Sequence, residues 1–263
     1  MRLALFDLDG TLLPGDSDHA FGEFLVASGI AEGDAFRRRN DAFYAAYQAG
    51  QLDIAAYIDF ITADWRARPA PDVDALRAAY LERVIRPMLR ASAQALVERH
   101  RAAGDMLAIV TATNDFVTRP IAALFGVEAL IATELERDAA GRVTGAIRGQ
   151  PAFREGKVAR VDAWLAAQGL TLADFERSVF YSDSANDLPL LMHVSDPVAT
   201  NPGPALEREF QRRQGLGAER GDGREEGESD EARAARRGLS DRGAPMPLPP
   251  EGRESSANRH SQP

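Results

Sequence analysis

From about residue 91 onward, short apolar runs alternate with longer stretches that have the periodicity of helices. We interpret the runs as buried strands, because they are short and end in polar or turn residues. Such alternation predicts a parallel sheet covered by helices on both faces, so the predicted fold class is α/β, a doubly wound, Rossmann-like sheet. The predicted strands are residues 3–8, 106–111, 129–132, 178–182 and a short strand near Val198, with helices at 92–103, 115–125, 155–168 and 184–193.

Residues 15–90 interrupt this alternation with one helical stretch after another. Aromatic residues recur there at helical spacing, which is typical of the core of a small helical bundle. We therefore predict a helical cap domain at 15–90, inserted into a core domain formed by residues 1–14 and 91–206. Within the core domain, residues 133–148 predict a hairpin that turns at 140–142.

The composition changes after residue 206. Residues 207–263 hold 23 charged residues, eight Gly and five Pro, but only five bulky apolar residues. A segment of this composition cannot bury enough apolar surface to offset its chain entropy, so we predict a disordered tail. The tail contains no repeat and no basic cluster, which gives little support to an interaction protein that works through it.

Charge and residue counts argue against several classes of protein. The formal net charge of −9 is the opposite of the basic surface that binds nucleic acid. No run of 18 apolar residues predicts a membrane span, and the absence of Cys excludes disulfides, thiolate nucleophiles and zinc–thiolate sites. The N-terminal residues form no signal-peptide core, so we expect a cytoplasmic protein, whose oligomeric state the sequence leaves open.

Two pairs of carboxylates follow predicted strands. Asp7 and Asp9 lie in the segment Phe-Asp-Leu-Asp-Gly-Thr after the first strand, and Asp183 and Asp187 follow the strand at 178–182. Ligands of doubly wound sheets bind at the carboxyl ends of the strands, where these side chains would meet. One isolated pair is often only a polar turn or a helix cap. Together, the four carboxylates predict an oxygen-rich site that suits Mg²⁺.

Two further residues fit such a site. Lys157 is the only lysine among 31 basic residues, and it lies at the start of a predicted helix. A compact ammonium is poorly replaced by a guanidinium at some sites, so this lysine is a candidate for a chemical role. Thr111 ends a predicted strand just before another helix, where the helix N-terminus could bind an anion, although Thr at this place is commonly a cap.

Taken in this order, the segments resemble the haloacid dehalogenase superfamily of phosphotransferases over roughly residues 3–204. The segments Asp-Ser-Asp-His, Ile-Val-Thr-Ala-Thr-Asn, Phe-Arg-Glu-Gly-Lys and Tyr-Ser-Asp-Ser-Ala-Asn-Asp-Leu-Pro-Leu-Leu resemble the branch related to phosphoserine phosphatase. In that branch a helical cap lies between the first and second motifs, and it includes bacterial proteins assigned as histidinol-phosphatases. After Leu206 the chain departs from this pattern, because a polar segment replaces the expected short helix and apolar closing segment.

The resemblance implies a Mg²⁺-dependent phosphomonoesterase that acts on a small phosphorylated metabolite through an aspartyl-phosphate. It implies that Asp7 is the nucleophile and that Asp9 is the general acid and then the general base. It further implies that Thr111 binds the phosphoryl oxygens and that Lys157 neutralises charge on the nucleophile and the phosphate. The implied metal-binding residues are Asp7, Asp9 (through its backbone carbonyl) and Asp183, with Asp187 and Asn186 in support.

Two substrates are compatible with this resemblance. Histidinol phosphate, which would place the enzyme in histidine biosynthesis, is preferred, and phosphoserine, an intermediate of serine synthesis, is the alternative. An acidic residue such as Asp16 or Asp18 would pair with the ammonium of either substrate, whereas an inward Arg would favour the carboxylate of phosphoserine. The candidate substrate-binding residues are Thr11, Asp16, Asp18, His19, Arg39, Asn114 and Arg154.

Simpler interpretations of some of these residues remain open. A lone His such as His19 is more often a core or surface residue, and the arginine run at 37–39 is more typical of a solvated face. A different class of protein, an inactive phosphate- or metal-binding protein of the same fold, is disfavoured because the full set of predicted catalytic residues is present.

Overall fold

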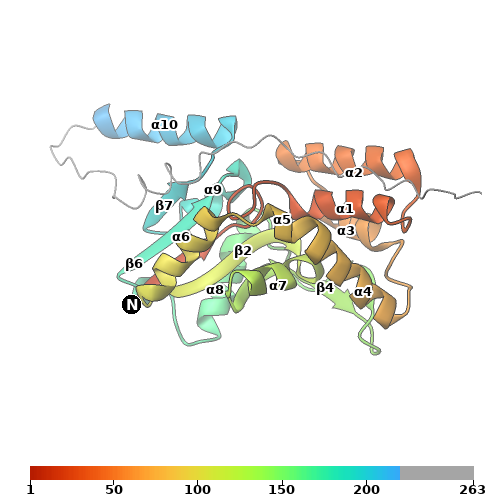
Figure 1. Ribbon diagram of the computed structural model, residues 1–263. Helices are drawn as coiled ribbons and strands as arrows, with labels where there is room; N and C mark the ends of the chain where they lie inside the picture. The colour runs from red at the N-terminus through yellow and green to blue at the C-terminus, as the bar shows by residue number, and fades with distance from the viewer. Residues whose placement is uncertain (220–263) are drawn as a thin grey trace, which may run out of the picture.

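The computed structural model describes residues 1–219, with side chains described through residue 212 (Figure 1). Its centre is a five-stranded sheet in the order β3-β2-β1-β6-β7, and all neighbouring strands are parallel. This arrangement confirms the predicted α/β class. The strands are β1 (Arg2–Phe6), β2 (Met106–Asn114), β3 (Ala129–Thr133), β6 (Arg177–Ser182) and β7 (Asp196–Ala199).

The predicted hairpin is confirmed as a separate antiparallel pair, β4 (Leu135–Arg137) and β5 (Val143–Ile147). The core domain also contains α6, α7, α8, α9 and α10, and the short 3₁₀ turns η2 and η3. Their bounds are α6 (Ala91–Ala102), α7 (Asp115–Leu124), α8 (Glu155–Ala166), η2 (Leu172–Asp174), η3 (Ala185–Asp187), α9 (Leu188–Leu191) and α10 (Pro204–Glu219).

Between β1 and α6, the chain forms the helices of the insertion. Figure 1 shows α1, α2 and α3 grouped together at one end of the molecule. The division into core, cap and tail at the bounds given above stays a prediction. The bounds of the inserted helices are α1 (Ser17–Ala27), α2 (Gly33–Gln48), α3 (Ile54–Thr62), α4 (Ala70–Tyr80), the π-helical turn η1 (Leu81–Ile85) and α5 (Arg86–Met88).

Alternate residues of β1 are buried in two different hydrophobic clusters, one on each face of the sheet. Leu3 and Leu5 belong to the cluster that α8, α9 and α10 cover, whereas Ala4 and Phe6 belong to the cluster that α6 and α7 cover. All four side chains are almost completely buried, so β1 is the central strand that the apolar run at 3–8 predicted.

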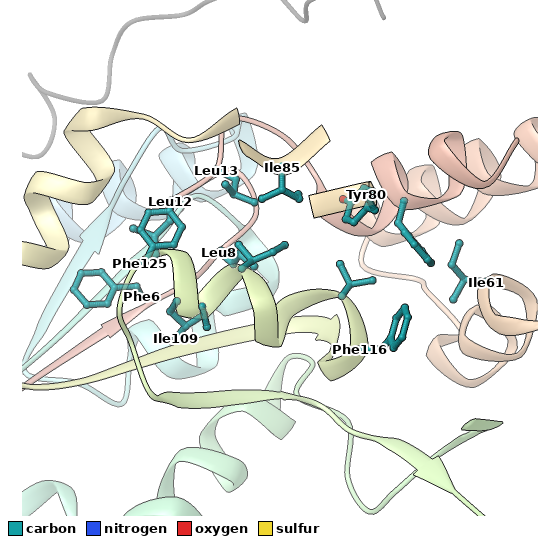
Figure 2. Close-up of a cluster of buried hydrophobic side chains, with 14 of the residues drawn as sticks. Phe6, Leu8, Leu12, Leu13, Ile61, Tyr80, Ile85, Ile109, Phe116 and Phe125 are labelled. Carbon is teal, nitrogen blue, oxygen red and sulfur yellow. The ribbon is translucent and has the colours of Figure 1, made fainter. Parts of the chain in front are cut away.

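The second of these clusters extends without a break into the inserted helices (Figure 2). Trp65 stacks on Phe116 of α7 with 4.2 Å between ring centroids, and Phe21 of α1 contacts the same ring edge-on at 6.0 Å. Tyr80 of α4 packs on Phe21 and donates a hydrogen bond of 2.6 Å to the carbonyl of Ser17. The aromatic stripes of the insertion are therefore core residues, and part of that core is the surface of α7.

Two predicted elements differ from the structure. The helix expected at 184–193 is a 3₁₀ turn followed by the four-residue helix α9, with Pro189 in its first turn. The strand expected at 106–111 continues to Asn114, because the Thr-Ala-Thr-Asn segment stays extended and pairs with β3 across an irregularity in register. Both differences lie where the chain leaves the sheet to form loops that the apolar pattern does not specify.

The predicted start of disorder at residue 207 was wrong, since α10 continues to Glu219. Leu206 is completely buried in the cluster with α8 and α9, and Phe210, one helical turn later, packs against that cluster. Two apolar residues at this spacing are sufficient to anchor a helix that is otherwise polar. The remainder of the predicted disordered tail, residues 220–263, lies outside the described residues.

Replacing Leu206 with Ala is expected to lower the free energy of unfolding by about 2–4 kcal/mol, because it removes a fully buried side chain and leaves a cavity. Thermal and urea denaturation would measure the loss. Arg208→Ala, a change at an exposed position of the same helix, is the matched control and should have little effect. Equal stability of Leu206→Ala and the parent protein would show that α10 does not pack on the sheet in solution.

Within residues 1–219, the structure contains no helix that combines the length and the apolar character needed to cross a membrane.

Candidate active site

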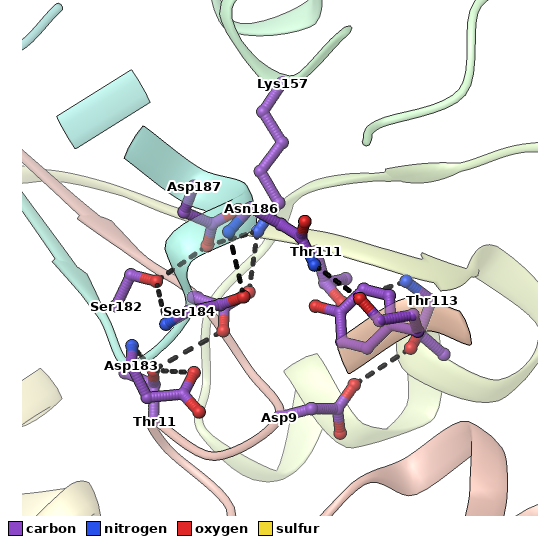
Figure 3. A network of polar contacts seen from close by, with 12 residues as sticks. Asp9, Thr11, Thr111, Thr113, Lys157, Ser182, Asp183, Ser184, Asn186 and Asp187 are labelled. Atoms are coloured by element: carbon purple, nitrogen blue, oxygen red, sulfur yellow. Dashed lines mark hydrogen bonds and ion pairs between the residues drawn. The ribbon is translucent and has the colours of Figure 1, made fainter. Parts of the chain in front are cut away.

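The carboxyl ends of the three central strands carry the predicted catalytic residues. Because β2, β1 and β6 are neighbours and parallel, Thr111 in β2, Asp7 just after β1 and Asp183 just after β6 meet at one edge of the sheet. Figure 3 shows Thr111 and Asp183 of this cluster together with Lys157, which enters from the first turn of α8. The segments that we expected to meet at the carboxyl ends of the strands therefore lie together in the structure.

Lys157 forms two ion pairs in the interior of the site. Its Nζ atom lies 2.8 Å from Oδ1 of Asp7 and 2.7 Å from Oδ2 of Asp187, and its side chain is 1% exposed. Burial alone would lower the pKa of Lys157, but the charges and hydrogen bonds of these two carboxylates raise it above its ordinary value. The amine is therefore fixed as an ammonium. Ser182 donates a hydrogen bond of 2.7 Å to the same oxygen of Asp187 and holds it in place.

The turn before α8 explains how Lys157 reaches this position. Gly156 lies against the carbonyl of Pro151, where any larger residue would collide with the backbone. Arg154 has a φ of 54°, an uncommon value for a residue with a side chain, and it reverses the chain into the helix. The two residues together aim the first turn of α8 at the strand ends.

Burial also acts on the nucleophile candidate. Burial raises the pKa of Asp7 to about 6, against the lowering effect of Lys157 and with a further increase from the charge of Asp187. At neutral pH Asp7 is therefore mostly a carboxylate that is poorly solvated and held by one ammonium. A desolvated carboxylate oriented in this way is suited to attack an electrophile at the pocket.

Thr11 and Gly10 bring Asp183 close to Asp7. The hydroxyl of Thr11 lies 3.4 Å from a carboxylate oxygen of each aspartate and accepts a hydrogen bond of 3.1 Å from the backbone N–H of Asp183. Gly10, with a φ of 76°, has no Cβ, and a Cβ there would overlap the carboxylate of Asp183. Burial and the charges of Asp7 and Asp187 raise the pKa of Asp183 well above its ordinary value.

Carboxylates outnumber cationic side chains in this part of the site. Lys157 is the one cationic side chain in contact with Asp7 and Asp187 among the described residues, while Asp9 and Asp183 have only neutral hydrogen-bond partners there. Buried carboxylates in this number need a cation or protons. The donor set consists entirely of oxygen atoms and therefore fits a hard divalent cation, with Asp7 and Asp183, which share the hydroxyl of Thr11, as candidate ligands.

Asp9 lies on the other side of Asp7, at the beginning of the inserted helices. One of its oxygens accepts a hydrogen bond of 2.7 Å from the N–H of Ser17, and the other accepts one of 2.9 Å from the hydroxyl of Thr113. Burial, followed by the negative charge of Asp16, raises the pKa of Asp9 to about 8. At neutral pH, Asp7 is therefore mostly ionised, whereas Asp9 is mostly protonated. A reaction that uses one carboxyl group as nucleophile and another as acid needs such a difference.

A pocket connects these residues with the inserted helices. Acidic and aromatic side chains dominate its wall, and none of the described residues that line it is Arg or Lys. Its floor consists of Asp7, Asp9 and residues 111–113. The lining residues from the insertion are Asp16, Asp18, His19, Asn40, Phe43, Tyr44, Tyr47, Leu52, Ile54, Tyr57 and Ile58.

Comparisons with known proteins agree with this geometry. The family model described as haloacid dehalogenase-like hydrolase matches residues 4–192. The chain belongs to this family. A histidinol-phosphatase of Neisseria meningitidis is 40% identical over 208 residues, which are 79% of this chain and 94% of that protein. A protein of Streptomyces azureus named for inhibition of morphological differentiation is 30% identical and covers 78% of this chain and 74% of its own.

Solved structures show the same fold. A protein of unknown function from Bordetella pertussis Tohama I is 50% identical, with a TM-score of 0.76 and coverage of 81% of this chain and 96% of its own. A phosphoserine phosphatase solved as an analogue of its phospho-aspartyl intermediate has a TM-score of 0.58 at 17% identity, covering 78% and 89% of the two chains. The predicted resemblance is confirmed, and the haloacid dehalogenase-like chain is an enzyme of the phosphatase type.

Not every predicted substrate-binding residue of this hydrolase lies at the pocket. Arg39 is exposed and lies over the rings of Phe43 and Phe60, with its guanidinium carbon 5.6 Å and 4.7 Å from their centroids. Arg154 is also exposed and donates a hydrogen bond of 3.1 Å to the carbonyl of Gly50. Neither is among the residues that line the pocket, and their contact with substrate stays a prediction. The rotation of a helix in the packed structure decides where its side chains point.

Two other predicted site residues, Asn114 and Asn186, are not among the residues that line the pocket. Asn114 donates a hydrogen bond of 3.0 Å to Asp18, while its own oxygen caps α7. Asn114 therefore caps the first turn of α7, which begins at Asp115, beyond Thr111, and an anion site at this helix N-terminus stays a prediction. Asn186 donates a hydrogen bond of 2.9 Å to the carbonyl of Tyr47 and thus joins the core domain to α2.

Asp16, Asp18 and His19 line the pocket as predicted. One oxygen of Asp16 accepts hydrogen bonds from the N–H groups of Asp18 and His19 and so caps α1. His19 also pairs with the exposed Asp41 at 2.8 Å and contacts the ring of Tyr44.

The sequence analysis assigned no individual role to Asn40, Thr113 or Ser182. A signal existed for Asn40, because it is the one polar residue on the helical face that also carries Phe36, Phe43 and Tyr47.

Proposed function

We propose that this phosphatase is a Mg²⁺-dependent phosphomonoesterase that hydrolyses a small amino-alcohol phosphate, with histidinol phosphate preferred over phosphoserine. The observation that carries the proposal is the acidic and aromatic pocket, which has no Arg or Lys among its described lining residues and opens directly onto Asp7 and Asp9. The relative named histidinol-phosphatase, which is 40% identical, supports the same substrate.

Asp7 is proposed as the nucleophile that attacks phosphorus and displaces the alkoxide. Attack by a carboxylate on a phosphate ester brings two anions together, and catalysis then depends on positioning and charge neutralisation. Lys157, bonded to Oδ1 of Asp7, leaves the second oxygen Oδ2 on the side of Thr11. In this scheme, the hydroxyl of Thr111 binds a phosphoryl oxygen, and hydrolysis of the aspartyl-phosphate restores the carboxylate.

Asp9 is proposed as the general acid and base. With a pKa of about 8, it holds a proton at neutral pH that it can transfer to the departing alkoxide. The resulting carboxylate can then accept a proton from the water that attacks the aspartyl-phosphate. Its hydrogen bonds with Ser17 and Thr113 keep the carboxyl group beside the pocket in both steps.

Mg²⁺ fits the excess of negative charge described above. Asp7, Asp183 and the backbone carbonyl of Asp9 would hold it, and Asp187 would support this set through Lys157 and Ser182. When bound, a divalent cation supplies neutralisation of charge on the phosphoryl group. Asp183 is kept against the backbone of Gly10 for this role, because no side chain separates the two.

The pocket chemistry distinguishes the two candidate substrates. Both carry an ammonium group that the carboxylates of Asp16 and Asp18 can accept, but phosphoserine also carries a carboxylate. Next to two buried aspartates, with no guanidinium in the described wall, that carboxylate would remain unpaired. Histidinol phosphate carries an imidazolylmethyl group where phosphoserine carries the carboxylate. Its imidazole ring would contact the aromatic side chains of the pocket.

Phosphate release from the two substrates, measured side by side with Mg²⁺, tests the proposal. We expect kcat/KM for histidinol phosphate to exceed that for phosphoserine by roughly 100-fold, as the unpaired carboxylate requires. Addition of EDTA is expected to abolish both activities, and Mg²⁺ should restore them. A preference for phosphoserine would overturn the substrate assignment, and the absence of release from any phosphomonoester would overturn the proposed activity.

A further inference from the structure

Asn40 is a buried polar residue whose hydrogen bonding is incomplete. It lies in α2 and is 1% exposed, and its carboxamide packs flat against Gly22 of α1, where a Cβ would come within 2.5–2.7 Å of it. Its Nδ2 atom donates a hydrogen bond of 2.9 Å to the carbonyl of His19, which fixes the orientation of the amide. Its Oδ1 atom has no hydrogen-bond partner among the described residues.

A buried acceptor without a partner is uncommon and is unfavourable for the fold. Packing of α1 on α2 explains why a flat side chain lies against Gly22, and the bond to His19 explains the amide nitrogen. Neither gives the amide oxygen a partner. A ligand that donates a hydrogen bond would provide one, because Asn40 is part of the pocket wall.

The neighbours of Asn40 indicate what kind of ligand this is. Phe43, Tyr44 and Tyr57 line the same pocket, and aromatic rings favour stacking or edge contact with a planar group. Asp16 and Asp18 line the same pocket and offer oxygen acceptors for an ammonium. A neutral amide oxygen is suited to an N–H of a planar heterocycle, because it accepts that hydrogen bond without adding another buried charge.

We propose that Asn40 is a specificity-determining residue whose Oδ1 accepts a hydrogen bond from a ring N–H at the end of the substrate remote from the phosphate. This inference rests on the proposed function and adds to it that the enzyme distinguishes a nitrogen heterocycle from a plain aromatic ring. The chemical class of substrate is an amino-alcohol phosphate that carries an N–H heterocycle, such as imidazole.

Three substrates separate the contributions of the pocket. Histidinol phosphate offers a ring N–H, phenylalaninol phosphate offers a ring without one, and p-nitrophenyl phosphate reports the phosphate site. For the parent enzyme, we expect kcat/KM for histidinol phosphate to exceed that for phenylalaninol phosphate by on the order of 10- to 100-fold. This measurement needs no variant, and equal values for the two substrates would overturn the role of Asn40 while leaving the phosphomonoesterase intact.

The variant Asn40→Leu is expected to lower kcat/KM for histidinol phosphate by about 10- to 100-fold, mainly through KM, and to affect the other two substrates much less. Thr62→Val is the matched control, because it also removes a buried side-chain hydrogen bond to the backbone, in α3, at a residue outside the pocket lining. It should not change the ratio of the substrates. An equal loss on all three substrates in Asn40→Leu would show a structural role only and overturn the proposal.

Failure of the proposed function gives a different result. A parent enzyme that releases phosphate from p-nitrophenyl phosphate but not from histidinol phosphate has another substrate, and both proposals fall. A parent enzyme that prefers histidinol phosphate to phosphoserine but not to phenylalaninol phosphate retains the proposed function and loses only the role of Asn40.

Discussion

Asp7→Asn is expected to abolish phosphate release, with a loss in kcat of at least about 10⁴-fold, because an amide cannot form the aspartyl-phosphate. The fold should persist. The pKa of Asp7 is raised by burial to about 6, so ionisation of this carboxyl opposes folding as the pH rises from about 4 through 6. A neutral amide removes that opposing effect at pH 7, and it can still accept the hydrogen bond of Lys157.

Phosphate release and thermal unfolding should be measured on the same preparations. Asp74→Asn provides the matched control, since it makes the same chemical change at an exposed residue of α4 that pairs with Arg77. It should retain full activity. A variant Asp7→Asn that folds normally and keeps activity within tenfold of the parent would assign the nucleophile to another residue.

Lys157→Met is expected to reduce both activity and stability. Removal of the ammonium leaves the buried carboxylates of Asp7 and Asp187 without a cation, which should lower the free energy of unfolding by about 3–5 kcal/mol. Without charge neutralisation at the nucleophile, kcat should fall by about 10²- to 10³-fold. Lys157→Arg should not restore activity, because the 1% exposed side chain has no room for a planar guanidinium that replaces a point charge.

A double variant separates the two effects of this lysine. Lys157→Met combined with Asp187→Asn removes one of the two uncompensated carboxylates, so it should recover part of the lost stability while activity stays low. Chemical denaturation and steady-state kinetics would measure the two quantities. Recovery of activity along with stability would mean that Lys157 acts only as a structural ion-pair partner of Asp187.

The central site was predictable because a simple geometric rule determines it. Residues that directly follow neighbouring parallel strands must meet at one edge of the sheet, and Asp7, Thr111 and Asp183 all satisfy this condition. Lys157 stood out by its rarity in an arginine-rich chain. For these residues, local position along the chain determines position in space.

The pocket wall was less predictable because it depends on how the inserted helices are rotated. Arg39 and Asn40 are adjacent, yet the first is exposed over the rings of Phe43 and Phe60 and the second is buried in the pocket wall. A composition argument failed for residues 207–219 for a related reason. It averages over a segment, whereas α10 is anchored by two residues, Leu206 and Phe210, that occupy one face.

The aromatic contact between Trp65 and Phe116 sets a condition for exchanging specificity between relatives. A chimera that transplants residues 15–90 alone would carry Trp65 and Phe21 away from the ring in α7 on which both pack. The recipient would then need a matching aromatic surface, or the hybrid would expose the apolar faces of both parts. An exchange of substrate specificity would therefore have to move the insertion together with the surface of α7 on which it packs.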